Sequence, residues 1–206
     1  MNTRRTTALL ITLICGAALI ALSACGAPTP SPALQNPTVE LDHVEVASYF
    51  PWPTTVPTAG PQTPTPAPIP ASRIPMVLAF VFDVTNPNPY PVTLKDLQHT
   101  VEFEAAPNEF FPVGNPFAHE DMSIPANTTN ELRVVMVLDS LVTPGNLAVT
   151  SGSRMKELGL TPGGVVSNWW STVGDFPFKI RVTGGSAEFS SPGGNAIVPF
   201  EGEYPE

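Results

Sequence analysis

Alternation of apolar and polar residues is the dominant pattern of this chain after position 76. Successive side chains of a β-strand point to opposite faces of the sheet, so an apolar residue at every second position predicts a strand with one buried face. Clusters of glycine, proline and asparagine separate the runs, as expected for turns between antiparallel strands. The chain is therefore predicted to be an all-β protein with an antiparallel sandwich or barrel. The apolar phases are Leu78, Phe80, Phe82 and Val84; Leu97, Val101 and Phe103; Leu132, Val134, Met136 and Leu138; Phe178, Ile180 and Val182; and Val198, Phe200 and Tyr204.

Only one segment of this region favours a helix. Residues 151–160 begin with serines that can cap a helix, and Gly159 and the following Pro162-Gly163 pair would end it. Two turns at most are predicted there. The glycine pairs at 163–164, 184–185 and 193–194 are interpreted as turn residues.

The segment 37–49 has the composition of a further strand. Val39 and Leu41 share one phase and Val44 and Val46 the other, so a bulge is predicted near Asp42-His43. Nine prolines follow between positions 51 and 75, too many for the interior of a strand or helix. Two interpretations remain. Either everything before about position 74 is a stalk, or 37–49 is the first strand and 50–75 is an inserted loop; the second is preferred, because a stalk does not need these apolar residues.

The N-terminus has the organisation of an export signal. Arg4 and Arg5 precede an uncharged apolar run, residues 8–22, which is too short to cross a membrane as a helix. The run ends in Leu22-Ser23-Ala24-Cys25, which resembles the bacterial lipobox. That resemblance implies removal of residues 1–24, a lipid on Cys25, and attachment to the cell membrane or outer membrane, facing away from the cytoplasm. The alternative is an ordinary secretory signal with an accidental cysteine.

A proline-rich linker, residues 25–36, follows the lipobox. Prolines on alternate residues, Pro28, Pro30 and Pro32, favour an extended polyproline II spacer. Residues 26–36 would reach roughly 34 Å in that conformation. This length is enough to hold a domain clear of a bilayer surface.

Composition excludes several functional classes. The net charge is −9, and clustered Lys and Arg are missing, which argues against nucleic-acid binding. The chain has two cysteines, Cys15 and Cys25. With the first removed and the second acylated, no thiol nucleophile, disulfide or thiolate metal site remains. No cofactor is predicted.

Residues 82–92 carry the most informative local pattern, FDVTNPNPYPV. Three prolines spaced by two remove backbone donors from one side of an extended chain, so a strand must end or bend there. The residue before each proline is held extended, and the asparagines can bond nearby backbone groups instead of a neighbouring strand. The motif is predicted to form a stiff corner between two strands. Its residues are Asn86, Pro87, Asn88, Pro89, Tyr90 and Pro91.

This strand–corner–strand arrangement resembles the late embryogenesis abundant group 2 family, also called the water stress and hypersensitive response domain. Ser123–Ala126 before the strand at 130–138, the pair 176–182 and 198–202, and the first strand at 37–49 extend the likeness over 37–204. The resemblance implies an immunoglobulin- or fibronectin-like β-sandwich, links to desiccation and cold stress, and no shared catalytic residues. The insertion at 50–75 and the Gly-rich passage at 140–175 depart from it.

Candidate catalytic and metal-binding residues are few. His119-Glu120-Asp121 could be half of a metal site, although solvated surface is the preferred interpretation, and no metal site is predicted. His99 lies in the inward phase of its strand and is expected at a boundary. No nucleophile elbow, paired-histidine motif or phosphate-binding loop occurs, so the protein is predicted not to be an enzyme.

The adjacent Trp169 and Trp170 are candidates for a contact site. In a strand, one would face the core and the other the surface, where it could contact a partner or a bilayer interface. The preferred alternative is an aromatic residue that covers the sheet edge.

Two functions follow from these observations. The first is a membrane-anchored, non-enzymatic module of the cell envelope that protects against stress or contacts client and envelope proteins. The second is an adhesion or assembly module that binds a specific protein or glycan through loops, for example near Trp170.

Overall fold

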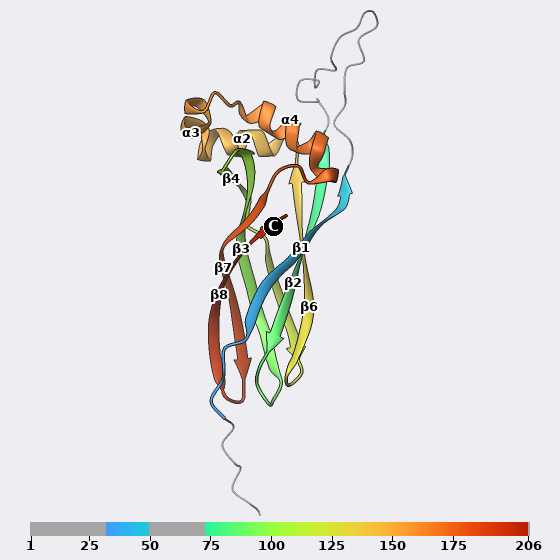
Figure 1. Ribbon diagram of the computed structural model, residues 1–206, viewed down its shortest axis with the longest axis vertical. Coiled ribbons are helices and arrows are strands. Elements are labelled where there is room, and N and C mark those ends of the chain that lie inside the picture. The colour runs from blue at the N-terminus through green and yellow to red at the C-terminus, as the bar shows by residue number, and fades with distance from the viewer. Residues whose placement is uncertain (1–31, 50–72, 206) are drawn as a thin grey trace, which may run out of the picture. The chain divides into compact units, whose positions relative to one another are not determined.

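The computed structural model describes residues 32–49 and 73–205, and the folded unit runs from Leu34 to Glu206. Two antiparallel sheets pack face to face in this unit, and short helices cover one end (Figure 1). The prediction of an all-β antiparallel sandwich is confirmed at this level. None of the helices in the described ranges is long and apolar enough to cross a bilayer.

The first sheet has three strands in the order β1-β2-β6. β2 is the central strand, and its predicted inward residues are fully buried. The pairing of β1 with β2 shifts between Leu41 and His43, where the sequence predicts a bulge, and again between Val46 and Ser48. The strands are β1 (Thr38–Tyr49), β2 (Pro75–Asn86) and β6 (Thr128–Asp139).

The second sheet has five strands, with the path β4-β3-β7-β8 and β5 also paired to β3. β4 and β5 follow the same edge of the long strand β3, because β4 pairs with its residues 101–106 and β5 with residues 92–98. They act as one edge strand that is broken between Gly114 and Phe117. The strands are β3 (Val92–Ala106), β4 (Glu109–Gly114), β5 (Phe117–Ile124), β7 (Ile180–Ser191) and β8 (Gly194–Tyr204).

The sandwich is closed along the side where β1 and β8 meet. A Cβ on Gly202 of β8 would lie 2.6 Å from the Cβ of Leu41 on β1, so only glycine permits this approach of the two strands. The opposite side, between β6 and the broken β4–β5 edge, is more open. Apolar side chains of both inner faces fill the interior, including Phe80, Phe103 and Phe189.

The predicted corner joins β2 to β3, and its two asparagines are fully buried. The Nδ2 group of Asn86 donates hydrogen bonds to the carbonyls of Tyr90, Ile124 and Pro125 at 2.9, 3.1 and 2.9 Å. Asn88 exchanges two hydrogen bonds with the backbone of Gln35, both at 2.8 Å. The corner therefore holds the β5–β6 turn and the start of the folded unit as well as its own backbone.

Helices occupy much more of residues 142–175 than the sequence indicates. The short helix expected at 151–160 is present as α3 (Gly152–Glu157), but α2 and α4 were not expected. The expectation that Gly163 and Gly164 lie in a turn is wrong, since both lie in the first turn of α4. Pro162 occupies the start of that helix, where a missing N–H costs nothing, and Thr161 accepts a hydrogen bond from the Gly164 amide at 3.2 Å. The helices are α2 (Val142–Thr150), α3 (Gly152–Glu157), α4 (Pro162–Thr172) and the short 3-10 helix η1 (Val173–Asp175).

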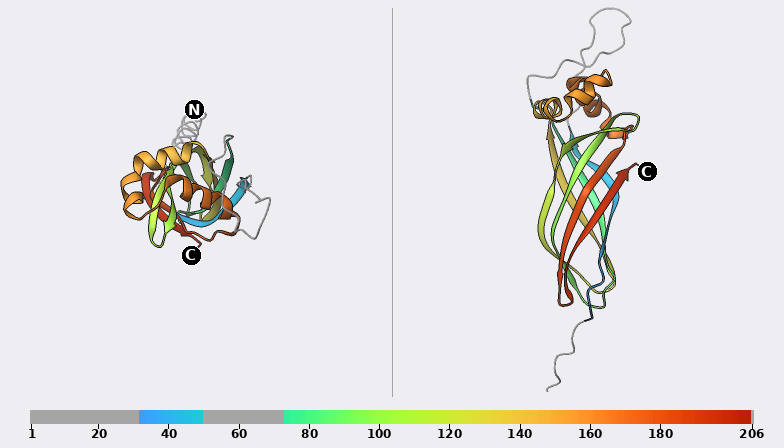
Figure 2. Two further views of the ribbon diagram at one scale, coloured as in Figure 1. Left: turned by 90° about the horizontal axis from the view of Figure 1, so that it is seen from above. Right: turned by 90° about the vertical axis from the view of Figure 1, so that its left-hand side faces the viewer.

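Trp169 and Trp170 lie in α4 rather than in a strand, and both are fully buried. The candidate interpretation that one of them is exposed for a contact is wrong, and the strand placement on which both interpretations rested is wrong too. Their indole groups donate to backbone carbonyls, Trp169 to Glu104 at 2.8 Å and Trp170 to Ile74 at 3.1 Å. Together they attach the helices to the end of the sandwich opposite the corner, as Figures 1 and 2 show for the helices.

Candidate functional site

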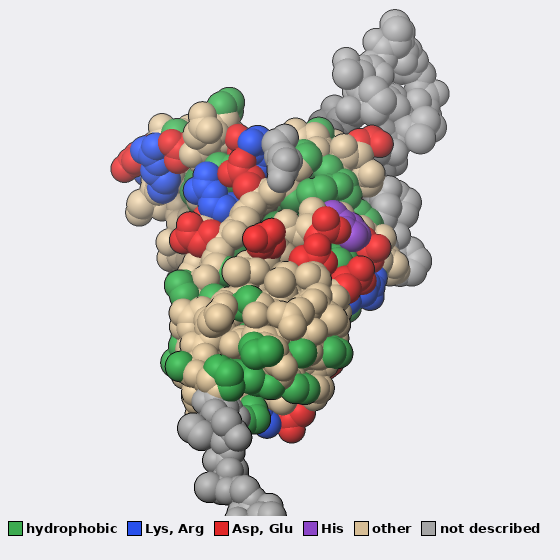
Figure 3. All heavy atoms as spheres, turned by 60° about the horizontal axis from the view of Figure 1, so that its bottom comes forward, with side chains coloured by type: hydrophobic (Ala, Val, Ile, Leu, Met, Phe, Trp, Pro, Cys, Tyr) green, Lys and Arg blue, Asp and Glu red, His purple; other side chains and the backbone are tan. Residues whose placement is uncertain are grey.

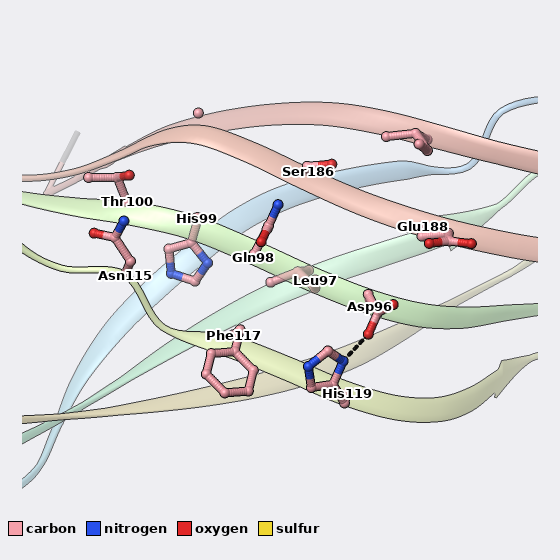
Figure 4. Close-up of a pocket in the computed structure, with 12 residues that line it drawn as sticks. Asp96, Leu97, Gln98, His99, Thr100, Asn115, Phe117, His119, Ser186 and Glu188 are labelled. Carbon is pink, nitrogen blue, oxygen red and sulfur yellow. Dashed lines mark hydrogen bonds and ion pairs between the residues drawn. The ribbon is translucent and has the colours of Figure 1, made fainter.

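An open groove of about 590 Å³ lies over the outer face of the five-stranded sheet. Leu97 and His99 of β3 are buried and point into the sandwich, so Asp96, Gln98 and Thr100 between them point outward into the groove (Figure 4). The break between β4 and β5, and the strands β5, β7 and β8, supply the rest of the lining. The lining residues are Asp96, Leu97, Gln98, His99, Thr100, Asn115, Phe117, His119, Gly184, Ser186, Glu188 and Ile197.

Irregular strand pairing shapes this part of the sheet. The register between β3 and β7 shifts between Gln98 and Thr100, and the register between β7 and β8 shifts between Val182 and Gly185. Such bulges bend and twist a strand locally. A Cβ on Gly185 would lie 2.4 Å from the carbonyl oxygen of Phe200, so this close approach needs glycine. The groove lies where the sheet is least regular.

Polar groups dominate the walls of the groove. Nδ1 of His119 on β5 is hydrogen-bonded to the carboxylate of Asp96, its cross-strand partner on β3. Ser186 and Glu188 face the groove from β7 (Figure 4). Carboxylates, hydroxyls, amides and an imidazole therefore surround one opening, and no lysine or arginine is in the described lining.

Phe117 is the exposed aromatic residue of the groove. Its side chain is 66 % exposed, and its ring centre lies 5.0 Å from that of His119. An apolar ring this exposed beside hydrogen-bonding groups provides a flat surface for stacking. The combination suits a ligand that has both apolar faces and hydroxyl groups.

The segment His119-Glu120-Asp121 does not assemble a metal site. His119 bonds Asp96, whereas Asp121 forms an ion pair with Lys95 at 2.7 Å. The described residues contain no group of three or more His, Cys, Asp or Glu side chains that could hold a metal ion. Among the same residues, no serine or threonine hydroxyl is hydrogen-bonded to His119.

His99 behaves differently from the boundary residue that was expected. Its side chain is 3 % exposed, in the middle of β3, and its ring lies 5.5, 5.1 and 6.0 Å from those of Phe80, Phe82 and Phe200. Neither ring nitrogen has a hydrogen-bond partner among the residues that the structure describes. Burial in this aromatic cluster lowers the pKa of His99 to about 4.

This pKa predicts a loss of stability in mild acid. The unfolded chain takes up a proton on His99 near pH 6.5, and the native state does so only near pH 4. The contribution of this histidine to the unfolding free energy is therefore fully present above pH 6.5 and is lost as the pH falls. We expect a loss of about 2 kcal/mol in unfolding free energy between about pH 7 and about pH 5. His99→Leu should abolish most of this slope in urea titrations, whereas His43→Gln, at an exposed site, should retain it. An unchanged slope in His99→Leu would contradict the assignment.

Several sequence-derived residues lie outside the described residues: the lipobox Leu22, Ser23, Ala24 and Cys25, and most of the inserted loop at 50–75. The corner residues are brought together at one end of the sandwich, away from the groove. Sequence reasoning missed the groove itself. The sequence carried only a weak signal for the groove, because Asp96, Gln98 and Ser186 look like ordinary outward residues of strands. Phe117, which follows Pro116, is the one apolar residue of the lining that stands out.

The fold and groove define a β-sandwich with an open polar site on one sheet face. No family model matches the chain, and no curated protein matches its sequence. Two solved structures are similar at 14 % identity. One is a protein from Archaeoglobus fulgidus, with a TM-score of 0.34 over 80 % of this chain and 96 % of that chain. The other is the structural-genomics target SoR45, with a TM-score of 0.35 over 80 % and 84 %.

Proposed function

We propose that this protein is a non-enzymatic binding module of the late embryogenesis abundant group 2 kind, held on the outer side of a bacterial membrane by a lipid on Cys25. The lipobox at 22–25 and the prolines that follow it support the anchor. The corner at 86–91 supports the family, because both of its asparagines carry buried hydrogen bonds.

We propose further that the sandwich is of the immunoglobulin or fibronectin type. In chain order, the first, second and sixth strands form one sheet, while the third, seventh and eighth lie together in the other. In immunoglobulin sandwiches, strands A, B and E lie in one sheet and strands C, F and G in the other. The first, second and sixth strands here match A, B and E, and the third, seventh and eighth match C, F and G, when β4 and β5 are counted as one edge strand between C and E.

The corner also gives the anchored domain a direction. Gln35, held by Asn88, is only ten positions after Cys25, a reach of roughly 30 Å in an extended spacer. The corner end would therefore face the membrane, and the helices at the other end would face away from it (Figure 1). The groove runs along the side of the domain and stays accessible in this arrangement.

The groove binds carbohydrate in this proposal. The observation that carries it is the exposed Phe117 ring among Asp96, Gln98, Asn115 and His119, which provides a stacking surface beside several donors and acceptors. Sugars present an apolar C–H face and a rim of hydroxyls, and both match these groups. The carboxylates favour a neutral sugar over an anionic one.

Phe117→Ala is expected to weaken binding of a neutral oligosaccharide by roughly tenfold, because it removes the stacking surface. Binding to the purified full chain in detergent would be measured by calorimetry, after a glycan array has identified a ligand. Val149→Ala is the matched control, since that side chain is 87 % exposed on α2, away from the groove. Equal loss in both variants, or array binding that is independent of Phe117, would contradict a site in the groove.

A stress-protective role is the second candidate, and the acidic surface favours it. The chain carries 18 Asp and Glu residues against 9 Lys and Arg, and Figure 3 shows the acidic side chains mainly over the upper and middle part of the displayed face, with basic ones beside them. Such a surface stays hydrated and supports weak contact with client proteins. This candidate stands if no sugar binds but the protein protects an enzyme during drying better than albumin does.

A further inference from the structure

The outer edge of β6 lacks the features that protect the other sheet edges. β1 is bulged twice, β8 contains Pro199, and the β4–β5 edge is broken and contains Pro112 and Pro116. β6 instead pairs with β2 over all of its twelve residues without a register shift, and contains neither proline nor lysine. Edge strands that are long and regular tend to pair with another strand.

The same strand exposes apolar side chains. Val135 and Val137 point outward and are 48 % and 65 % exposed. Beside them lies a groove of about 320 Å³ between residues 135–138 of β6 and residues 113–117 at the break of the other sheet. Alternate backbone groups of β6 face away from β2, and these are the groups that an added strand would bond.

We propose that β6 pairs with β6 of a second copy of this chain, antiparallel and centred on Met136, so that two three-stranded sheets join into one. In this register Val135 lies opposite Val137 of the second copy, and Arg133 lies opposite its Asp139. Two-fold symmetry makes each of these contacts twice. The inference concerns β6 alone and does not depend on what the carbohydrate groove binds.

Charge and apolarity favour this register over its neighbours. A shift by two residues in one direction places Glu131 opposite Asp139 of the second copy, and a shift in the other direction places Val135 opposite that aspartate. A shift by one residue would place the outward backbone groups of one β6 opposite residues whose backbone groups bond β2 in the other copy, so the strands could not form a ladder. Arg133 already contacts Glu45 at 3.0 Å and Asp139 contacts Arg73 at 3.6 Å, but their side chains remain 45 % and 26 % exposed.

Disulfide trapping tests the register directly. Directly opposed residues in an antiparallel pair are about 4.5–5.5 Å apart at Cα, within the span of a disulfide, whereas diagonal ones are about 7–8 Å apart and outside it. In the full chain carrying Cys15→Ser and Cys25→Ser, Val135→Cys and Val137→Cys would each be made alone. Oxidising a mixture of the two in detergent should give a covalent dimer of up to about half of the chains, because random pairing makes half of the dimers mixed. Each variant oxidised alone should give little.

Control variants distinguish cross-linking within a specific dimer from cross-linking during random encounters between molecules. Val149→Cys, which is highly exposed on α2, reports random encounters and should give little dimer. Arg133→Glu added to both partners places Glu opposite Asp139 and should lower the yield. The proposal is overturned if the mixture links no better than Val149→Cys, if Val135→Cys alone links as well as the mixture, or if oxidation in cells joins these cysteines to a different protein instead.

Discussion

Trp170→Ala is expected to lower the unfolding free energy by about 3–5 kcal/mol, the usual cost of removing a fully buried tryptophan. Trp170 is 0 % exposed in α4, and its indole donates to the carbonyl of Ile74 at 3.1 Å. Ile74 is also bonded to Ser140, through contacts of 2.9 and 3.2 Å, just after β6. The substitution therefore leaves a cavity and removes one of the two hydrogen bonds to the Ile74 carbonyl, while the Ser140 amide still donates to it, at the point where the helices join β2 and β6.

Urea unfolding followed by circular dichroism measures this effect. Val149→Ala on α2 should change the unfolding free energy by less than about 0.5 kcal/mol, because its side chain is in solvent. Trp170→Phe should be milder than Trp170→Ala, since it keeps most of the buried volume. If Trp170→Ala costs no more than Val149→Ala does, the helices are not part of the cooperative core.

Asn86→Ala is expected to lower the unfolding free energy by about 3–5 kcal/mol, although it removes only a small polar side chain. The buried amide donates to three carbonyls, and its Oδ1 accepts from the backbone N–H of Asn88 at 2.9 Å. Each buried group that loses its partner costs about 1–3 kcal/mol. Because Asn86 joins the corner to the β5–β6 turn, the loss should appear as a lower midpoint of one transition.

Asn130→Ala is the matched control for the corner. Asn130 is also a strand asparagine, but its single hydrogen bond, to the carbonyl of Ser123 at 3.3 Å, is exposed. We expect this substitution to change the unfolding free energy by less than about 0.5 kcal/mol. A similar small effect in Asn86→Ala would contradict the structural role given to the corner.

The strands were predictable because their signal is local. A period of two is visible in β3 and β6, and the phase change at Asp42-His43 marks the bulge in β1. The corner was predictable for the same reason, since proline and asparagine act on their own backbone and their immediate neighbours. What the sequence did not reveal is that Asn88 also holds Gln35, 53 positions away.

α2, α4 and the groove were not predictable, for two different physical reasons, whereas α3 lies within the helix expected at 151–160. Valine, threonine and glycine in 142–172 have weak helix propensity, and burial of Leu147, Trp169 and Trp170 against the end of the sandwich overrides it. The groove depends on bulges in three strands and on a break between two others, so its residues are neighbours only after the sheet has formed.

Strand alternation and the proline corner are determined by neighbouring residues, because each depends on backbone geometry over a few positions. The fully buried position of His99, the helical state of both tryptophans, the open edge of β6 and the site around Phe117 were decided only by tertiary structure. Each of these depends on which surfaces meet across the two sheets, and burial and exposure are properties of the packed chain rather than of any short stretch of it.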